Sequence, residues 1–196
     1  RTLQTFVDTC NQDYERKMLN KLGNDLYYFD QVVEGKKKQQ RANQNPLPTG
    51  FLVYTKHKFS TTRTFENVYF EEQPVVKKRV EFFLGNRSWY ERKGIPYTLG
   101  FLFHGSPGTG KTSEIKAIAN VARRHPVNIQ LSEIKTKTQL RHLFFSDDIH
   151  VFNGNTLEKY TIPISERVYI IEDADAMGDI LLNRDWKRPA AKQSVP

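Results

Sequence analysis

Residues 105–112 constrain the fold of this chain more than any other part of the sequence. They read Gly-Ser-Pro-Gly-Thr-Gly-Lys-Thr, which fits the pattern G-x-x-x-x-G-K-[ST] without a gap. A short apolar run at 99–103 precedes this segment, and a helical pattern over 111–124 follows it. Because a loop of this pattern between a strand and a helix cradles phosphate groups, the segment predicts the core of a P-loop NTPase.

Each part of this phosphate loop has a physical task. The glycines let the backbone turn tightly and bring its N–H groups close to phosphate oxygens. The helix that begins near Lys111 directs its positive N-terminal end at the same anion. We expect Lys111 to reach the β- and γ-phosphates and the Thr112 hydroxyl to hold Mg²⁺. The predicted ATP contacts are Gly105, Ser106, Pro107, Gly108, Thr109, Gly110, Lys111, Thr112 and Ser113.

A second apolar run, at 168–171, ends in the acidic residues Glu172 and Asp173. A strand beside the one that carries the phosphate loop would deliver these carboxylates to the nucleotide. By position, Glu172 takes the metal role together with Thr112, and Asp173 takes the role of general base that activates the attacking water. The predicted catalytic residues are therefore Asp173, Glu172 and Lys111, and the predicted cofactors are ATP and Mg²⁺.

The rest of the chain divides into three predicted parts. Residues 1–60 read as a small mixed α+β region, with an amphipathic helix over about 2–22 and strands at 26–29 and 51–54. Residues 61–182 alternate apolar strands with helices, which predicts an α/β core with a parallel sheet and flanking helices. Residues 183–196 read as a loop or tail. Within the core we expect helices from Pro74 and at 88–93, 111–124 and 138–145, and strands at 99–103, 127–131 and 167–171.

Composition excludes two classes of protein and leaves the partner open. The single cysteine, Cys10, excludes a domain built on intrachain disulfides. No apolar run approaches the roughly 20 residues that a membrane-spanning helix needs, so we expect a soluble, intracellular segment. The formal net charge of +8 is compatible with nucleic acid, anionic membranes or phosphate ligands, and it does not choose between them.

Two stretches beside the phosphate loop carry a family resemblance. Residues 89–104 run straight into the loop and contain Trp-Tyr, Gly-Ile-Pro-Tyr and a glycine before the apolar run; residues 171–176 place Glu before Asp. Together these stretches resemble AAA-type ATPases. The most similar is the mitochondrial chaperone family that translocates the Rieske iron–sulfur protein during assembly of the cytochrome bc complex. Residues 51–56 and 62–72 are similar to that family's middle domain and to the lead-in to its ATPase core.

The resemblance implies a homo-oligomeric ring that hydrolyses ATP to move or remodel a protein client, and it makes a mitochondrial location an expectation. It also implies that adenine packs near Asn67 and Val68. An AAA core continues past its acidic strand to a polar sensor residue, an arginine finger and a helical lid, whereas this sequence stops at Pro196. We therefore expect a fragment, with a core truncated at its C-terminus, that binds nucleotide and turns it over weakly or not at all.

Two alternatives stay open. Residues 132–137 lack the aromatic residue and the glycine of a threading loop, which disfavours threading but not the remodelling of a folded client. A nucleic-acid motor is the second hypothesis, supported by the net charge and by the cations Lys135, Lys137 and Arg141. Phe144 and Phe145 could stack bases, but on an amphipathic helix such residues are more often part of the core. A nucleotide-binding module without turnover is the third.

Overall fold

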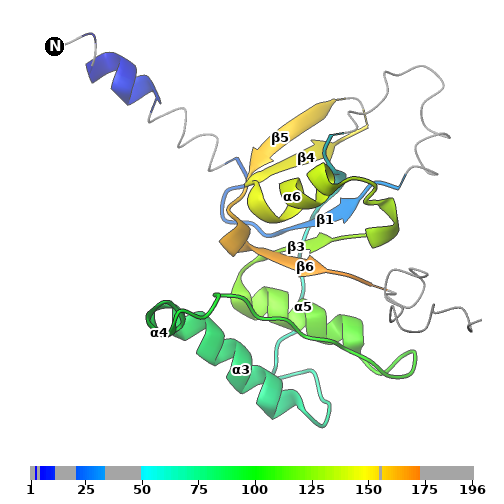
Figure 1. Ribbon diagram of the computed structural model, residues 1–196. Helices are drawn as coiled ribbons and strands as arrows, with labels where there is room; N and C mark the ends of the chain where they lie inside the picture. The colour runs from blue at the N-terminus through cyan, green and yellow to red at the C-terminus, as the bar shows by residue number, and fades with distance from the viewer. Residues whose placement is uncertain (1–2, 4, 12–20, 34–49, 155, 173–196) are drawn as a thin grey trace, which may run out of the picture.

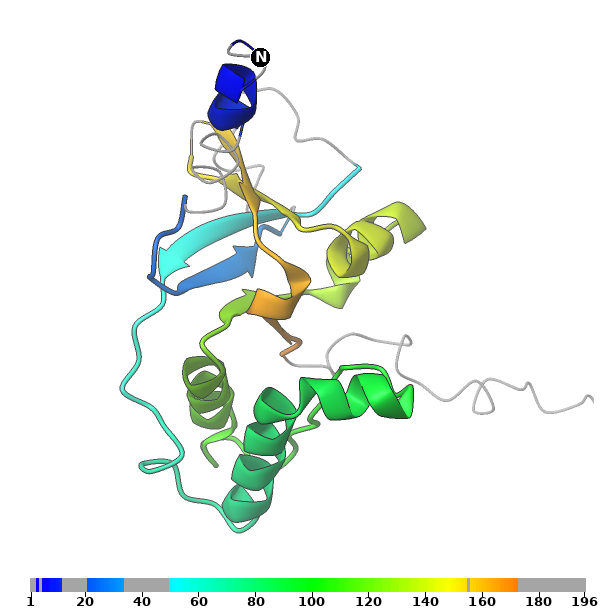
Figure 2. The same cartoon turned by 90° about the vertical axis from the view of Figure 1, so that its left-hand side faces the viewer.

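The computed structural model describes residues 3, 5–11, 21–33, 50–154 and 156–172. A 6-stranded sheet in the order β5-β4-β2-β1-β3-β6 forms its centre. Helix α6 lies on one face of this sheet, whereas α5, α3 and α4 lie beyond its β6 edge (Figure 1). The view turned by 90° shows the same separation between the sheet and the α3–α5 region (Figure 2).

The sheet is mixed. Strands β1 and β2 pair antiparallel, as do β4 and β5, whereas β1–β3, β2–β4 and β3–β6 pair parallel. An α/β core with flanking helices is confirmed, but the expected parallel sheet includes two antiparallel pairs. The strands are β1 (Tyr27–Gln31), β2 (Val53–Lys58), β3 (His125–Asn128), β4 (Asp148–Phe152), β5 (Leu157–Thr161) and β6 (Arg167–Ile170).

The sheet crosses the predicted boundary between residues 60 and 61. Strands β1 and β2 come from the N-terminal region, yet β1 pairs with β3 and β2 pairs with β4. At the centre of the first pairing, Phe29 lies opposite Val127, and both side chains are buried. The N-terminal region therefore shares a hydrogen-bonded sheet with the core; its division from the core as a domain stays a prediction.

The helices begin and end near the proline and glycine residues that mark helix boundaries in the sequence. They are α3 (Gln73–Gly85), α4 (Arg87–Lys93), α5 (Lys111–Ala122) and α6 (Lys137–Phe145). Pro74 stands in the first turn of α3, where its missing N–H costs nothing. Gly94 ends α4 in the left-handed conformation, with φ of 63°. These helices confirm the predicted ones. Of the N-terminal helix predicted over 2–22, residues 3 and 5–11 are helical, 12–20 lie outside the described residues, and 21–22 belong to a turn, so the predicted end of this helix is wrong.

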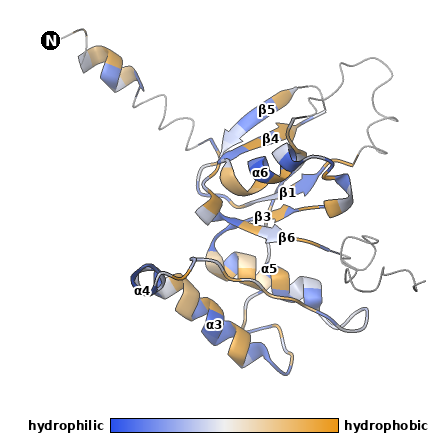
Figure 3. Ribbon diagram, in the orientation of Figure 1, coloured by the Kyte–Doolittle hydropathy of each residue, from blue (hydrophilic) through white to orange (hydrophobic). Residues whose placement is uncertain are grey.

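Two apolar clusters hold these elements together. The larger one fills the space between the sheet and α6, and α6 contributes the buried Leu143. Apolar and hydrophilic positions alternate along α3, α5 and α6, so each helix has a side suited to packing (Figure 3). The buried members of the larger cluster are Phe29, Leu52, Tyr54, Val127, Ile129, Leu143, Ile149, Val151, Tyr160 and Ile162.

The smaller cluster joins α3 to α5. Its buried members are Phe65, Val80 and Ile118, and the partly buried Leu99, Phe101 and Phe103 pack against them. The segment 99–103 thus alternates as a strand would, with Leu102 facing outwards at 84% exposure. The expectation of a strand here is wrong, because within the described residues this segment pairs with no strand and packs on helices instead.

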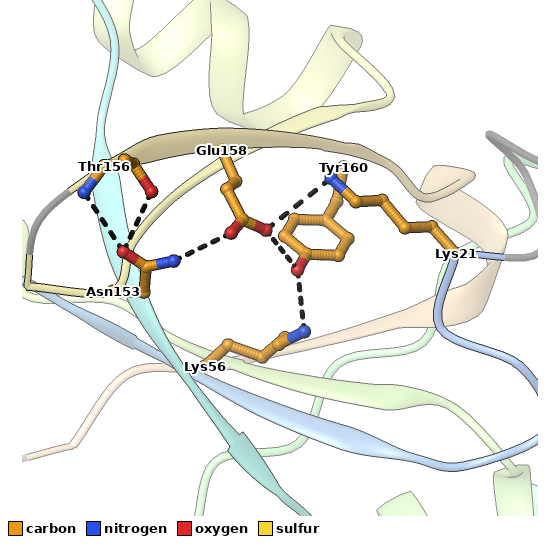
Figure 4. A network of polar contacts seen from close by, with 6 residues as sticks. All are labelled: Lys21, Lys56, Asn153, Thr156, Glu158 and Tyr160. Atoms are coloured by element: carbon orange, nitrogen blue, oxygen red, sulfur yellow. Dashed lines mark hydrogen bonds and ion pairs between the residues drawn. The ribbon is translucent and has the colours of Figure 1, made fainter.

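A hairpin of β4 and β5 is present that the sequence analysis missed. A polar network ties it to β2 and to the segment before β1 (Figure 4). Lys56 Nζ donates to the Tyr160 hydroxyl at 2.7 Å, and this hydroxyl donates to Glu158 Oε2 at 2.7 Å. Lys21 Nζ lies 3.5 Å from the same carboxylate oxygen. Burial and the hydrogen bond to Glu158 raise the pKa of Tyr160 to about 12, so the network keeps a neutral phenol between two charged groups.

Candidate nucleotide-binding site

The phosphate loop turns through backbone conformations that favour glycine. Gly108 has φ of 82° and Gly110 has φ of 93°, a region that L-residues with a side chain rarely adopt. The second of these glycines stands immediately before α5 as its N-cap. The sequence pattern therefore specifies the local backbone here, since other residues at these two positions would be strained.

Lys111 folds back over this loop. Its Nζ donates hydrogen bonds to the carbonyl oxygens of Gly105, at 2.8 Å, and Ser106, at 2.9 Å. The Thr109 hydroxyl also donates to the carbonyl of Ser106, at 2.9 Å. The ammonium group is thus held over the loop by two neutral acceptors on an exposed surface, and phosphate oxygens are acceptors that it would bind more strongly.

The N-terminus of α5 is free to bind an anion. Gly110 caps the helix without any side-chain hydrogen bond, and the earliest helical bond runs from the N–H of Glu114 to the carbonyl of Gly110, at 3.0 Å. The N–H groups before Glu114 therefore have no partner within the helix, which is the usual state of a helix N-terminus. Together with Lys111 they make a positively polarised cradle whose chemistry fits a phosphate chain.

Thr112 and Glu172, the two predicted metal ligands, are both exposed. Glu172 follows β6, whose end faces the same side of the molecule as the phosphate loop in Figure 1. In the described part of the chain no hydrogen bond or ion pair joins Glu172 to Lys111 or Thr112, and no group of three or more potential metal-ligating side chains occurs. Asp173, the predicted general base, lies outside the described residues.

The arrangement of β6 differs from the one expected. We expected the acidic strand beside the strand that carries the phosphate loop, but β6 pairs with β3 and ends the sheet, while 99–103 packs against α3 and α5. Glu172 instead lies near Tyr28 of β1: burial raises the pKa of Tyr28 to about 12, and the Glu172 carboxylate adds to this rise. Among the described residues no hydrogen bond or ion pair joins Glu172 to the phosphate loop, and its role as a metal ligand stays a prediction.

Asn67 and Val68 serve the fold of the loop in which they stand. Asn67 accepts a hydrogen bond from the N–H of Thr64 at 2.9 Å and donates one to the carbonyl of Thr62 at 2.7 Å, while Val68 is buried. The side chain of Asn120 on α5 donates to the carbonyl of Arg63, at 2.9 Å. This loop is therefore hydrogen-bonded to the last turn of α5, the helix whose first turn follows the phosphate loop. Contact with adenine stays a prediction.

One residue that the sequence analysis missed stands in the first turn of α5. Glu114 is only 5% exposed, and its Oε1 has no hydrogen-bond partner among the described residues. Burial, with a smaller contribution from the Glu72 carboxylate, raises the pKa of Glu114 to about 7. The spacing of Glu114 in the sequence could have indicated this burial, because Glu114 stands four positions before Ile118 on the apolar side of the helix.

Part of this chain is similar to a known family of proteins. Residues 101–185 match the family described as "ATPase family associated with various cellular activities (AAA)". "AAA-ATPase At4g25835" of Arabidopsis thaliana is 27% identical over 86% of this chain and 32% of its own length. "AAA-ATPase ASD, mitochondrial" of the same plant is 23% identical over 80% of this chain and 29% of its own length. "Probable mitochondrial chaperone BCS1-A" of Dictyostelium discoideum is 42% identical over 33% of this chain and 15% of its own length. The chain spans about a third of the length of the curated relatives it matches most extensively.

Proposed function

We propose, from the match of residues 101–185 to the AAA ATPase family, that this chain binds ATP with Mg²⁺ and hydrolyses it to move or remodel a protein client. The observation that carries this proposal is the phosphate loop itself. Its glycines adopt the conformations that the motif requires, α5 begins without a side-chain cap, and the Lys111 ammonium is held above the loop. These features make one continuous surface suited to a phosphate chain.

Each residue of the site has a proposed task. Backbone N–H groups at the start of α5 bind phosphate oxygens, and Lys111 stabilises the negative charge of the β- and γ-phosphates. Thr112 and Glu172 are the residues that would hold Mg²⁺, which when bound supplies charge neutralisation on the phosphates. Asp173 orients the attacking water and accepts its proton.

The proposed mechanism requires Glu172 and Asp173 to face the loop. Strand β6 pairs with β3 along one edge, and no strand among the described residues pairs with its other edge. Asn67 and Val68 lie in the loop that is hydrogen-bonded to Asn120 in the last turn of α5, and the proposed contact with adenine rests on the family resemblance.

A ring of identical subunits is proposed from the family resemblance, and a protein client from the names of two relatives. These two, from Dictyostelium discoideum, are named probable mitochondrial chaperones, and one plant relative is named mitochondrial, which supports a mitochondrial location for this chain as well. Among the described residues, no helix combines the length and the apolar character needed to cross a bilayer.

Asp173→Asn separates turnover from binding. The substitution keeps the size of the side chain but removes its ability to accept a proton, so we expect ATP affinity to stay near that of the wild type. Hydrolysis in a single-turnover assay with radiolabelled ATP should slow by roughly 100-fold or more. The assay is run at nucleotide concentrations that saturate both proteins.

Equal single-turnover rates in the wild type and in Asp173→Asn would remove the proposed general base. If both proteins bind ATP and neither hydrolyses it, the chain acts as a nucleotide-binding module without turnover. Either result would leave the phosphate loop in place, because that part of the proposal is tested separately by substitution of Lys111.

A further inference from the structure

Helix α6 exposes a surface of cationic and aromatic side chains that has no role in the proposed hydrolysis of ATP. We call it the α6 outer face and define it by Lys137, Leu140, Arg141, Phe144 and Phe145, all of which are exposed. Phe145 is 81% exposed, which is unusual for so large an apolar side chain. The helix runs from Lys137 to Phe145 and contains no acidic residue.

The order of these side chains around the helix is informative. With about 3.6 residues per turn, Lys137 and Arg141 follow one another along the middle of the exposed side, at a step of about 6 Å. Phe144 and Leu140 flank this cationic row on one side, and Phe145 flanks it on the other. Figure 3 shows hydrophilic and hydrophobic positions side by side on this helix. The rings thus border the charges instead of lying on the opposite side of the helix.

The cations of the α6 outer face are available to a ligand. Neither Lys137 nor Arg141 forms an ion pair with a residue in the described ranges. The acidic residues nearest the helix in the sequence are Glu133, Asp147 and Asp148. Asp147 accepts a hydrogen bond from the N–H of Ile164 at 3.1 Å, and Asp148 pairs with Lys159 at 2.8 Å. The surface therefore keeps a local excess of positive charge on a protein with a formal net charge of +8.

The fold holds this surface rigidly. Thr136 and Gln139 form a capping box at the start of α6. Near its end, Leu143 is buried in the large cluster, and the Tyr169 hydroxyl donates to the carbonyl of Leu143 at 2.6 Å. The Phe144 ring stands edge-on to the Tyr169 ring, with 5.2 Å between centroids. One ring is thus fixed in place, and the binding of a ligand here need not order the helix first.

We propose that the α6 outer face binds single-stranded nucleic acid. Lys137 and Arg141 pair with successive phosphates along the central row, and Phe144 and Phe145 offer platforms on which unpaired bases stack. Paired bases in a duplex are already stacked, which disfavours double-stranded partners at these rings. An interfacial membrane helix needs its cations on the side opposite its apolar residues, whereas here the cations lie between them.

Fluorescence anisotropy of the full chain with labelled oligo(dT) of about 20 nucleotides, longer than the site of one small binding domain, tests this proposal. We expect the wild type to bind, and its affinity to fall steeply as salt rises. Phe145→Ala should weaken binding by about 5- to 150-fold, the range for loss of one stacked base. The double variant Lys137→Gln/Arg141→Gln should reduce the slope of log affinity against log salt by about 1.4, or about 0.7 for each phosphate that is no longer neutralised.

The matched control is Lys78→Gln/Arg79→Gln, which removes two exposed cations from α3 and leaves the α6 outer face intact. It should change the salt slope much less than the α6 pair does. The proposal fails if the wild type shows no binding at about 50 mM salt, where such electrostatic binding is strong, or if the control weakens binding as much as the α6 variants. It also fails if these variants abolish binding to anionic vesicles or to a polyglutamate peptide but leave oligo(dT) binding unchanged.

This proposal is independent of the proposed ATPase function. Lys111→Ala removes a cation of the phosphate loop and should leave oligo(dT) binding unchanged, because Lys111 is not part of the α6 outer face. Conversely, Phe145→Ala should leave ATP affinity unchanged. Thermal unfolding of each variant shows whether the chain still folds, and the exposure of Phe145 leads us to expect little loss of stability.

Discussion

Lys111→Ala is expected to weaken ATP binding by this chain strongly. In the structure its Nζ donates only to two loop carbonyls, at 2.8 and 2.9 Å, so removal of the side chain leaves no buried charge behind and should not unfold the loop. The variant lacks the cation that we propose to face the β- and γ-phosphates. Removal of one partner from such a charge pair costs about 2–5 kcal/mol, which corresponds to a roughly 30- to 5000-fold lower affinity.

Isothermal titration calorimetry with Mg·ATP measures this loss, and Lys116→Ala is the matched control. Lys116 is an exposed lysine on the same helix, so its removal changes the net charge equally without touching the loop. We expect the control to keep its affinity within about threefold of the wild type, since a surface charge away from the ligand is screened. A similar loss in both variants would mean that Lys111 acts only through net charge.

Two outcomes would contradict the phosphate-loop assignment. The first is a Lys111→Ala protein that binds Mg·ATP as tightly as the wild type. The second is a folded wild type that gives no heat of binding at any accessible concentration. In the second case the loop geometry would be present without the affinity, and the pocket would require residues beyond those that the structure places near Lys111.

The phosphate loop could be predicted from sequence because its information is local. Glycines at 108 and 110 and a lysine at 111 specify the turn, and the structure has that turn with positive φ at both glycines. The helices were predictable for the same reason, since Pro74 and Gly94 mark boundaries that depend on their own backbone preferences. Apolar periodicity and boundary residues such as proline and glycine suffice to predict a segment's conformation wherever that conformation does not depend on a distant partner.

The segment 99–103 shows where local information ends. Its apolar alternation is that of a strand, and Leu99, Phe101 and Phe103 do pack inwards. A strand also needs a hydrogen-bonded neighbour, and that neighbour is not encoded in the segment. The same limit affects Glu172: its position after an apolar strand was predictable, but which strands flank β6 was not.

The β4–β5 hairpin was missed although its signal was present. Ile149 and Val151 alternate with polar residues before the turn at Asn153 and Gly154, and Tyr160 and Ile162 alternate after it. Gly154 has φ of 97°, as a tight turn between two strands requires. The joining of β1 to β3 could not be predicted in this way, because about a hundred residues of chain separate Phe29 from Val127 and no local pattern records their contact.

Glu114→Gln is expected to stabilise the protein at alkaline pH and to change the way its stability depends on pH. The carboxyl of Glu114 is buried, Oε1 has no partner among the described residues, and its pKa rises from 4.5 to about 7. Because the folded state then holds the proton more tightly than the unfolded chain, the contribution of Glu114 to the free energy of unfolding is greatest below pH 4.5. It falls as the pH rises from 4.5 through about 7, and then levels off.

The shift corresponds to a loss of at most about 3 kcal/mol at pH 8, and we expect about 1–3 kcal/mol after relaxation of the surroundings. Glutamine cannot ionise, so the variant should be more stable than the wild type at pH 8 and comparable to it at pH 5. Urea unfolding at pH 5, 6, 7 and 8 measures both curves. Glu81→Gln, an exposed carboxyl on α3, is the control and should follow the wild type. Parallel curves for the wild type and Glu114→Gln would mean that the carboxylate of Glu114 stays hydrated in the folded state, which would contradict this prediction.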